Sequence, residues 1–427
     1  EMLSDRNRSV ISALVLCIGL VHHSDAFTSS AIHKTVLQAS TKGLLSSVQS
    51  KCCNFRIRGP TMSSTMSGQP TIVQNDAQAS EHDLLLRVAR GEKGERTPVW
   101  LMRQAGRYMK AFKEYSDKYP FRVRSETPDI AIELSLQPFK AFGTDGVIMF
   151  SDILTPLPSM GIEFDVVKGS GPVIFDPIRS AVQVSKLKKI DDPDKTTPFL
   201  RTILSSLRKE TEGKTTLLGF VGSPFTLAAY AIEGKANKNC YQTKKMMYNN
   251  PALLHSILSH IADSIGVYAC HQVDSGAQVL QLFESWAHHL GPDDFSVFAK
   301  PYADRVAAAI KAKHPTVPII YFANGGSSYL ERQRDMKADM IGVDWAVDMA
   351  EARRILGPGV PISGNVDPLV LMGPEEKIRE SVRDCIRKGG GQGHILNLGH
   401  GVIEPTPEAA VAAFVDEAKR FRYTPGN

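Results

Sequence analysis

Two arginines, Arg103 and Arg107, follow the apolar run "VWLM" and flank the small residues Ala105 and Gly106. A guanidinium group binds a carboxylate or a phosphate through paired hydrogen bonds. Gln104 and the two small residues would let such a ligand approach the backbone closely. For a single arginine, an ion pair with an interior acid is an equal alternative. For a pair at this spacing we predict an anion-binding site.

A carboxylate, Asp152, ends the apolar segment "GVIMFSD". An isolated buried charge is costly, so this side chain needs either a partner or a task. The alternative is that Asp152 caps a following helix. Pro156 and Pro158 make a helix at that position unfavourable. We therefore predict that Asp152 is a functional carboxylate.

Three further polar residues follow apolar segments and extend the candidate site. Tyr230 lies about two helical turns after Ser223 in "GSPFTLAAYAIEG", so the two residues share a helix face. Taken alone, Tyr230 is more often a core tyrosine. Ser285 ends "VLQLFES", and His400 stands between glycines in "NLGHG". We predict that Tyr230, Ser285 and His400 contact the same ligand.

Sequence motifs of several other chemistries are missing. The sequence contains no P-loop, no HExxH or GxSxG motif and no cluster of cysteine and histidine. The adjacent pair His288 and His289 would point in divergent directions, so we predict no metal there. Arginines, one carboxylate, a tyrosine and a histidine suit decarboxylation, isomerisation or elimination.

Apolar runs predict the strands that would bring these side chains together. Amphipathic stretches lie between the runs, and two of them, 292–313 and 374–390, have clear helical spacing. The expected strands are "VWLM" (99–102), "GVIMFSD" (146–152), "LLGFVG" (217–222), "VLQLFES" (279–285), "PIIYFANG" (318–325), "MIGVDW" (340–345), "PISGNVD" (361–367) and "HILNLGHG" (394–401).

Eight near-continuous apolar strands that alternate with helices indicate a parallel sheet covered on both faces. We predict an α/β fold, a single-domain (β/α)8 TIM barrel over residues 76–427. A β-hairpin insertion is expected at 161–177, after the second strand, because alternating segments flank Lys168-Gly169-Ser170-Gly171. The rival open sheet lacks a GxGxxG after its first strand. In such a barrel the strand ends named above form one catalytic face.

Composition excludes some partners. The 427 residues are 42% hydrophobic and 22% charged, with a formal net charge of +5. Residues 1–75 carry +4 of this charge, so the remainder is nearly neutral and a nucleic-acid partner is not indicated. Cys240, Cys270 and Cys385 lie outside that basic segment and form no CxxC pair. An odd number of such cysteines indicates a reducing compartment and no disulfide framework.

The first 75 residues have the composition of a targeting leader. Residues 10–21 are apolar and follow Arg6 and Arg8, which is typical of a signal peptide over 1–26 and too short for a comfortable membrane span. Residues 27–75 contain no Asp or Glu and many Ser and Thr, as transit peptides do. The arrangement resembles the bipartite leaders of algae with secondary plastids. We predict a plastid (chloroplast) location, with a disordered tail and a cytosolic protein as the alternative.

The body of the chain resembles the uroporphyrinogen decarboxylase family. The resemblance runs from about Leu84 to Phe421 and includes several motifs in order. These motifs are "TPVWLMRQAGRYM", "FSDILTPLPSMGIEF", "GSPFTLAAYAIEG", "LQLFESWAHHLGP", "DWAVDMAEAR", "GNVDP" and "NLGHGV". So many motifs in one order are very specific.

The resemblance implies an activity and a set of site residues. It implies a cofactor-independent homodimer that removes the four acetate carboxylates of uroporphyrinogen III as CO2 and gives coproporphyrinogen III, an intermediate of haem and chlorophyll biosynthesis. The catalytic residues would be Asp152, Arg103 and Arg107. The substrate-binding residues would be Arg103, Gln104, Ala105, Gly106, Arg107, Phe121, Asp152, Tyr230, Ser285 and His400. The anion expected at the arginine pair is then a substrate carboxylate.

Two alternatives remain on the same scaffold. Zinc-dependent methyltransferases that use corrinoid or cobalamin share this barrel and bind zinc through His-x-Cys and a later Cys. The corresponding stretches here, 322–325 and 398–401, contain no cysteine. The other alternative is a non-catalytic tetrapyrrole-binding protein, which the complete polar set makes less favourable.

Overall fold

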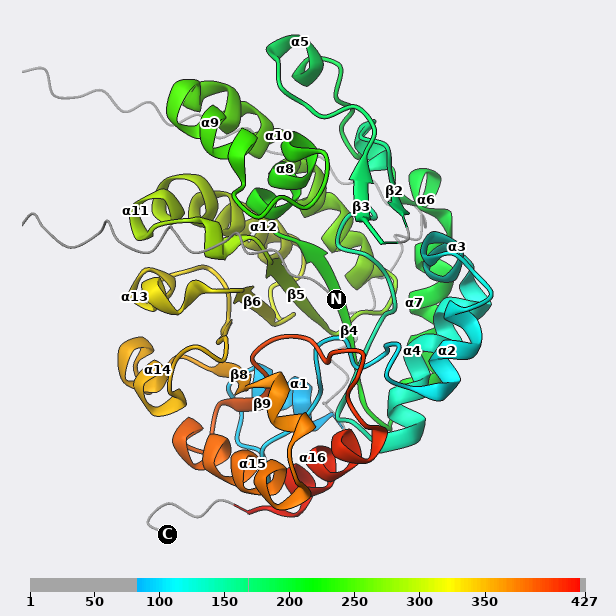
Figure 1. Ribbon diagram of the computed structural model, residues 1–427, viewed down its shortest axis with the longest axis vertical. Coiled ribbons are helices and arrows are strands. Elements are labelled where there is room, and N and C mark those ends of the chain that lie inside the picture. The colour runs from blue at the N-terminus through cyan, green and yellow to red at the C-terminus, as the bar shows by residue number, and fades with distance from the viewer. Residues whose placement is uncertain (1–82, 168, 423–427) are drawn as a thin grey trace, which may run out of the picture. The chain divides into compact units, whose positions relative to one another are not determined.

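The structure is a computed structural model that describes residues 83–422 except Lys168 (Figure 1). The predicted signal peptide (1–26) and the transit-peptide-like leader (27–75) lie outside the described residues. No helix among those described combines the length and the apolar character needed to cross a bilayer.

Seven parallel strands form one curled sheet. Its order is β1-β4-β5-β6-β7-β8-β9, so neighbours in the sheet are also consecutive strands of this sheet along the chain. The strands are β1 (Gly146–Ile148), β4 (Thr216–Gly222), β5 (Val279–Glu284), β6 (Ile319–Ala323), β7 (Met340–Gly342), β8 (Ile362–Val366) and β9 (His394–Leu398). They are buried almost throughout, which explains why they read as continuous apolar runs.

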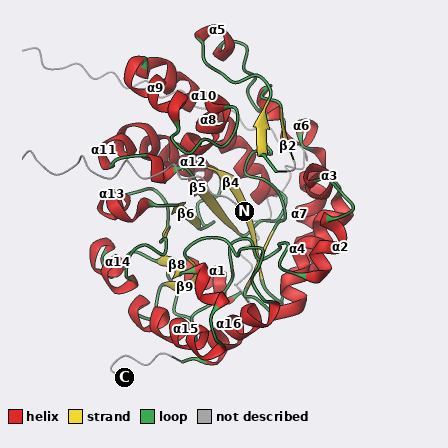
Figure 2. Cartoon of the chain, in the orientation of Figure 1, coloured by secondary structure: helices red, strands yellow, loops and turns green. Residues whose placement is uncertain are grey.

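Helices surround the strands in Figure 2. They are α1 (Leu84–Ala89), α2 (Lys110–Ser116), α3 (Phe121–Glu126), α4 (Pro128–Phe142), α5 (Ala181–Val184), α6 (Pro193–Thr196), α7 (Pro198–Thr211), α8 (Pro224–Glu233), α9 (Tyr241–Asn249), α10 (Pro251–Asp274), α11 (Pro292–Asp294), α12 (Lys300–Lys313), α13 (Leu330–Gln333), α14 (Met349–Leu356), α15 (Glu375–Gly389) and α16 (Glu408–Arg420). The predicted helix at 292–313 is divided, because a π-helical turn, η3 (Phe295–Ala299), separates α11 from α12.

The predicted first strand, 99–102, is reduced to a single parallel bridge between Val99 and Leu396. Leu396 donates its N–H to Pro98 at 2.9 Å, and Asp145 donates its N–H to Val99 at 2.8 Å. This segment therefore contacts β9 on one side and the start of β1 on the other. A regular ladder stops here because the Asp145 carboxylate accepts the Val99 N–H at 2.8 Å. The chain then turns at Arg103, whose φ is 58°.

The inside of the curled sheet is filled by one apolar cluster. Its side chains come from α1, from the 99–102 segment and from strands around the sheet. They are Leu84, Leu85, Leu86, Val88, Ala89, Trp100, Met102, Leu218, Val279, Ile320, Phe322, Met340 and Ile395, with Ile148 and Phe283 packed against them. Figure 1 shows α1 inside the ring of outer helices. A packed interior of this kind leaves the rim of the sheet as the place for a site.

A second, two-stranded sheet follows β1. In it β2 (Phe164–Val167) pairs antiparallel with β3 (Gly171–Ile174). Ile174 donates its N–H to the carbonyl of Gly234, the residue that directly follows α8, at 2.6 Å. This small sheet therefore lies against the helix that carries Tyr230.

Candidate active site

The polar residues predicted for the site follow different strands at one edge of the sheet. The 99–102 segment leads into Arg103, β1 leads into Asp152, and β4 leads into α8 with Tyr230. Ser285 comes directly after β5, and His400 lies two residues after β9. Because all these strands are parallel, their carboxyl ends lie on the same face.

The arginine loop is held from below by Gln104. This residue is 1% exposed, and its amide nitrogen donates to the Gly146 carbonyl at 3.0 Å. Its amide oxygen accepts the Leu101 N–H at 3.3 Å, and its own carbonyl accepts the Tyr108 hydroxyl at 2.7 Å. Gln104 thus shapes the loop, whereas Arg103 and Arg107 on either side of it are exposed.

Arg103 lies within electrostatic range of three other predicted residues. Burial raises the pKa of Asp152, and the Leu154 N–H and Arg103 oppose that rise. Burial also lowers the pKa of His400, and Arg103 lowers it further. Tyr230 has a raised pKa because it is buried, with Asp152 raising and Arg103 lowering the value. The structure therefore brings Arg103, Asp152, Tyr230 and His400 together.

The Asp152 side chain is half-buried and oriented by the backbone. Its Oδ1 accepts the Leu154 N–H at 2.7 Å. No ion pair to Asp152 occurs among the described residues, although Arg103 is near enough to stabilise its charge. A desolvated carboxylate without a fixed ion pair is free to interact with a cationic or hydrogen-bond-donating ligand.

Tyr230 and Ser285 are linked through Trp286. The rings of Tyr230 and Trp286 lie with their centroids 4.7 Å apart. Ser285, half-buried, accepts a hydrogen bond from the Asn324 side chain through its carbonyl at 3.1 Å. The turn after β5 is therefore tied both to α8 and to the end of β6.

Arg107 points to another part of the rim. Its guanidinium lies 3.0 Å from the carboxylate of Glu404, and the two side chains are 63% and 49% exposed. Phe121, half-buried at the start of α3, packs on Phe150 with ring centroids 5.4 Å apart. The buried Arg124 guanidinium lies over the Phe121 ring, and its pKa is lowered by burial and then by Arg107.

The rings of His288 and His289 lie with their centroids 4.0 Å apart and do not diverge as predicted, and the His289 ring packs on Trp286 with the centroids 5.3 Å apart. Among residues 83–422, no three His, Cys, Asp or Glu side chains gather as metal ligands would.

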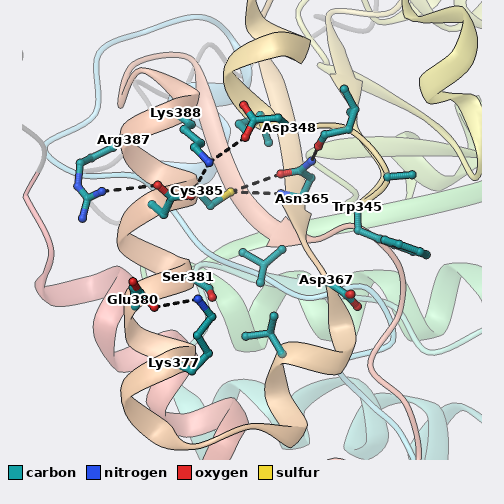
Figure 3. A pocket seen from close by; sticks show the side chains of 16 residues that line it. Trp345, Asp348, Asn365, Asp367, Lys377, Glu380, Ser381, Cys385, Arg387 and Lys388 are labelled. Atoms are coloured by element: carbon teal, nitrogen blue, oxygen red, sulfur yellow. Dashed lines mark hydrogen bonds and ion pairs between the residues drawn. The ribbon is translucent and has the colours of Figure 1, made fainter.

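A crevice of about 550 Å³ opens between the segment after β7 and α15 (Figure 3). Its charges are paired within the protein, for example Lys388 with Asp348 at 2.8 Å. None of the predicted site residues lines it.

Three residues near the site were not predicted from the sequence. Trp286 packs on Tyr230, and its position directly after Ser285 was the available signal. Arg124 follows Phe121 by one helical turn, so helical spacing could have indicated it. Glu404 lies in an irregular loop, and no pattern in the sequence relates it to Arg107.

The fold and the rim residues define a class of protein. A curled parallel sheet surrounded by helices carries arginine, aspartate, tyrosine and histidine side chains at its carboxyl edge, which suits a small anionic ligand. Residues 80–421 match the family described as "Uroporphyrinogen decarboxylase (URO-D)". The chain belongs to this family.

Relatives and a solved structure agree with the family and the fold. The relative named uroporphyrinogen decarboxylase from Crocosphaera subtropica is 54% identical over 343 residues, which are 80% of this chain and 97% of that protein. The relative of the same name from a Synechocystis species is 53% identical over 344 residues, which are 80% and 98% of the two chains. The structure of a "methyltransferase from Methanosarcina mazei" has a TM-score of 0.66 at 18% identity and covers 78% of this chain and 97% of its own. At that identity the likeness concerns the fold alone.

Proposed function

We propose that this protein is a carboxy-lyase that removes the four acetate carboxylates of uroporphyrinogen III as CO2 and forms coproporphyrinogen III. One observation carries the proposal: Arg103, Asp152, Tyr230 and His400 share one electrostatic environment in a chain of the uroporphyrinogen decarboxylase family. The family favours this activity over zinc-dependent methyl transfer and over a carrier without catalysis.

The residues divide between holding the substrate and promoting the reaction. Arg103 and Arg107 bind substrate carboxylates, and Arg107 exchanges its Glu404 partner for one of them. Tyr230, Ser285 and His400 contact further carboxylates, and Phe121 contacts the macrocycle. Ala105 and Gly106 leave room for close approach, whereas Gln104 acts by shaping the loop.

Asp152 acts on the ring that reacts. Its free carboxylate oxygen accepts hydrogen bonds from pyrrole N–H groups and stabilises a positive charge on the ring. Protonation of a pyrrole carbon makes that ring an iminium-like cation. The C–C bond to the carboxylate breaks, CO2 leaves, and the electron pair forms an exocyclic double bond to the ring. A second proton adds to the exocyclic carbon, and loss of the ring proton restores the pyrrole with a methyl group.

This scheme needs no separate electron sink, because the protonated substrate accepts the electron pair. The net change at each side chain is the replacement of a carboxylate by a proton. We therefore propose catalysis without a cofactor. Arg103 and Arg107 assist only by holding the proton source in place, since a guanidinium group is a poor acid.

Anaerobic incubation of the purified protein with uroporphyrinogen III in the presence of a chelator tests the activity. We expect products with seven, six, five and four carboxylates to appear in succession. A control with protein in which Asp152 is replaced by Asn measures the background. Tight binding without loss of carboxylates would favour the carrier, whereas tight binding of zinc with neither binding nor decarboxylation of uroporphyrinogen would favour the methyltransferase.

We further propose a closed eight-stranded barrel with a hairpin insertion, a homodimer and delivery to the plastid. The contacts of Val99 with Leu396 and Asp145 support closure, and the antiparallel pair β2–β3 supports the hairpin.

The family resemblance supports the dimer. The composition of residues 1–75 and the cyanobacterial relatives support the plastid. Light scattering tests the dimer, and a fluorescent protein fused to residues 1–75 tests the location, where a diffuse cytosolic signal would contradict it.

A further inference from the structure

Four polar side chains form a buried cluster directly beneath the rim of the site. They come from the end of β4, the start of α8, the end of β5 and the middle of β6. They are Ser223, Thr226, Glu284 and Tyr321, and each is 0% exposed. Thr226 donates a hydrogen bond from Oγ1 to the Glu284 carboxyl group. We define these four residues as the Glu284 cluster.

The Glu284 cluster contains three buried polar atoms outside the regular hydrogen-bond network. Ser223 Oγ, Glu284 Oε2 and the Tyr321 hydroxyl make no hydrogen bond of regular geometry among the described residues, although both hydroxyls lie close enough to the Glu284 carboxyl group to influence its pKa. No ion pair to Glu284 occurs there either. An ionised carboxylate at such a place is strongly unfavourable, whereas a neutral acid is both a donor and an acceptor. Burial accordingly raises the pKa of Glu284 to about 7, against the opposing effect of the Thr226 and Ser223 hydroxyls.

The Glu284 cluster is connected to the site by two short routes. Along the chain, Glu284 is followed by Ser285 and Trp286. In space, Thr226 Oγ1 accepts the Trp286 N–H at 3.2 Å and so joins the Glu284 carboxyl group to the turn after β5. The Trp286 ring in turn lies 4.7 Å from the ring of Tyr230. A shift of the Glu284 side chain would therefore displace two residues proposed to contact the substrate.

We propose that Glu284 is a positioning residue that works as a neutral carboxylic acid and fixes Ser285 and Trp286, and through Trp286 also Tyr230. The catalytic part of this inference rests on the proposed decarboxylase function. A neutral acid also leaves the wall behind Ser285 without a negative charge, which matters because the substrate carries carboxylates. Ionisation of Glu284 would repel a carboxylate bound at that wall.

Other titratable groups near Glu284 do not explain a loss of substrate binding as the pH rises. His288 and His289 lie in the turn after β5, and burial lowers the pKa of both, so they are neutral in the range in which Glu284 would titrate. Tyr321 from β6 and Tyr329 from the 3-10 helix η4 (Gly326–Tyr329) interact with it. Burial raises the pKa of both phenols well above the usual tyrosine value, and Glu284 raises them further. Both therefore stay neutral throughout the range in which Glu284 would titrate.

Two matched substitutions test the positioning. Thr226→Val removes the hydroxyl that joins Glu284 to Trp286 and keeps the shape, whereas Thr226→Ser keeps the hydroxyl. We expect the valine variant to raise KM by about tenfold with a smaller change in kcat, and the serine variant to stay near the wild type. The tryptophan fluorescence spectrum, to which Trp100 and Trp345 contribute a constant background, should shift in the valine variant only. Equal behaviour of the two variants would overturn the proposal.

A third substitution, Glu284→Gln, tests the neutral state. Glutamine can donate and accept in the same place but does not ionise. Near pH 6.5 we expect the kcat/KM of the glutamine variant to be within about threefold of the wild-type value. Above about pH 7 the KM of the wild type should rise as Glu284 ionises, whereas the KM of the variant should stay constant. Infrared difference spectra of the two proteins should show the carbonyl band of a protonated acid in the wild type. A carboxylate band in its place would overturn the proposal.

The readouts separate this inference from the proposed activity. If the wild-type protein releases no CO2 from uroporphyrinogen, the proposed function fails. The infrared band still reports whether Glu284 is neutral, and the change in tryptophan fluorescence between the two Thr226 variants still reports whether Glu284 fixes the turn after β5. If the wild type is active and both Thr226 variants behave alike, the function stands and the positioning role fails.

Discussion

Replacement of Asp152 by Asn removes a charge and keeps most of the geometry. The Asn Oδ1 can still accept the Leu154 N–H, which Asp152 binds at 2.7 Å. A positive charge on the substrate ring about 4 Å away would interact with the carboxylate by about 4 kcal/mol at an effective dielectric constant of about 20. Loss of one preorganised electrostatic group typically costs about 10²- to 10³-fold in rate. We expect kcat to fall by that factor and substrate binding to change less.

Steady-state kinetics and thermal melting together test this reasoning. The pKa of Asp152 is raised by burial, so its ionised form destabilises the folded state above the ordinary pKa of an aspartate. The Asn variant should therefore melt at the wild-type temperature or slightly above it. Asp191 is exposed, so Asp191→Asn serves as the control and should change neither kcat nor the melting temperature. Asp152→Glu keeps the charge but extends it into the site, so it should also weaken binding.

The pH dependence gives a second check on Asp152. Because its pKa is raised, the carboxylate should take up a proton at a higher pH than an ordinary aspartate. As the pH falls through that pKa, kcat/KM of the wild type should fall, and this limb should be absent from the residual activity of the Asn variant. An Asn variant that melts far earlier but keeps its kcat would refute the catalytic role, since that pattern belongs to a structural ion pair.

Three further substitutions probe the arginines. In Gly401→Ala the new methyl group would overlap the Arg103 side chain, so kcat/KM should fall by about tenfold or more at a nearly unchanged Tm; unchanged kinetics would mean that Arg103 does not act from this position. Glu404→Gln should lower KM by up to about fivefold, because the exposed pair with Arg107 contributes about 0.2–1 kcal/mol that the substrate must displace; a higher KM would show that Glu404 helps binding. Arg107→Lys should lower kcat/KM by more than about tenfold, since lysine lacks the planar fork; near-wild-type kinetics would leave Arg107 a surface charge.

The sequence alone determined the strands of the sheet and the rim on which the polar residues lie. Buried parallel strands must be apolar on both faces, so β4 to β9 were visible as runs, and the residues that follow them were visible as exceptions. The rule that parallel strands end on one face then placed Asp152, Tyr230 and His400 together without coordinates. The arginine motif indicated an anion for the same local reason, the chemistry of a guanidinium group.

The tertiary structure decided everything that depends on which distant segments meet. The 99–102 segment is a bridge rather than a full strand because the Asp145 carboxylate takes the Val99 N–H. Gln104 is turned inward by a hydrogen bond to Gly146, and Arg107 faces Glu404 across the rim. Glu284 is the last residue of β5, and its burial among hydroxyl groups, which favours the neutral form, is set by segments from β4, α8 and β6. Local periodicity carries no information on such contacts, because hydrogen-bond partners and the loss of water around a charge are set by chain segments far apart in sequence.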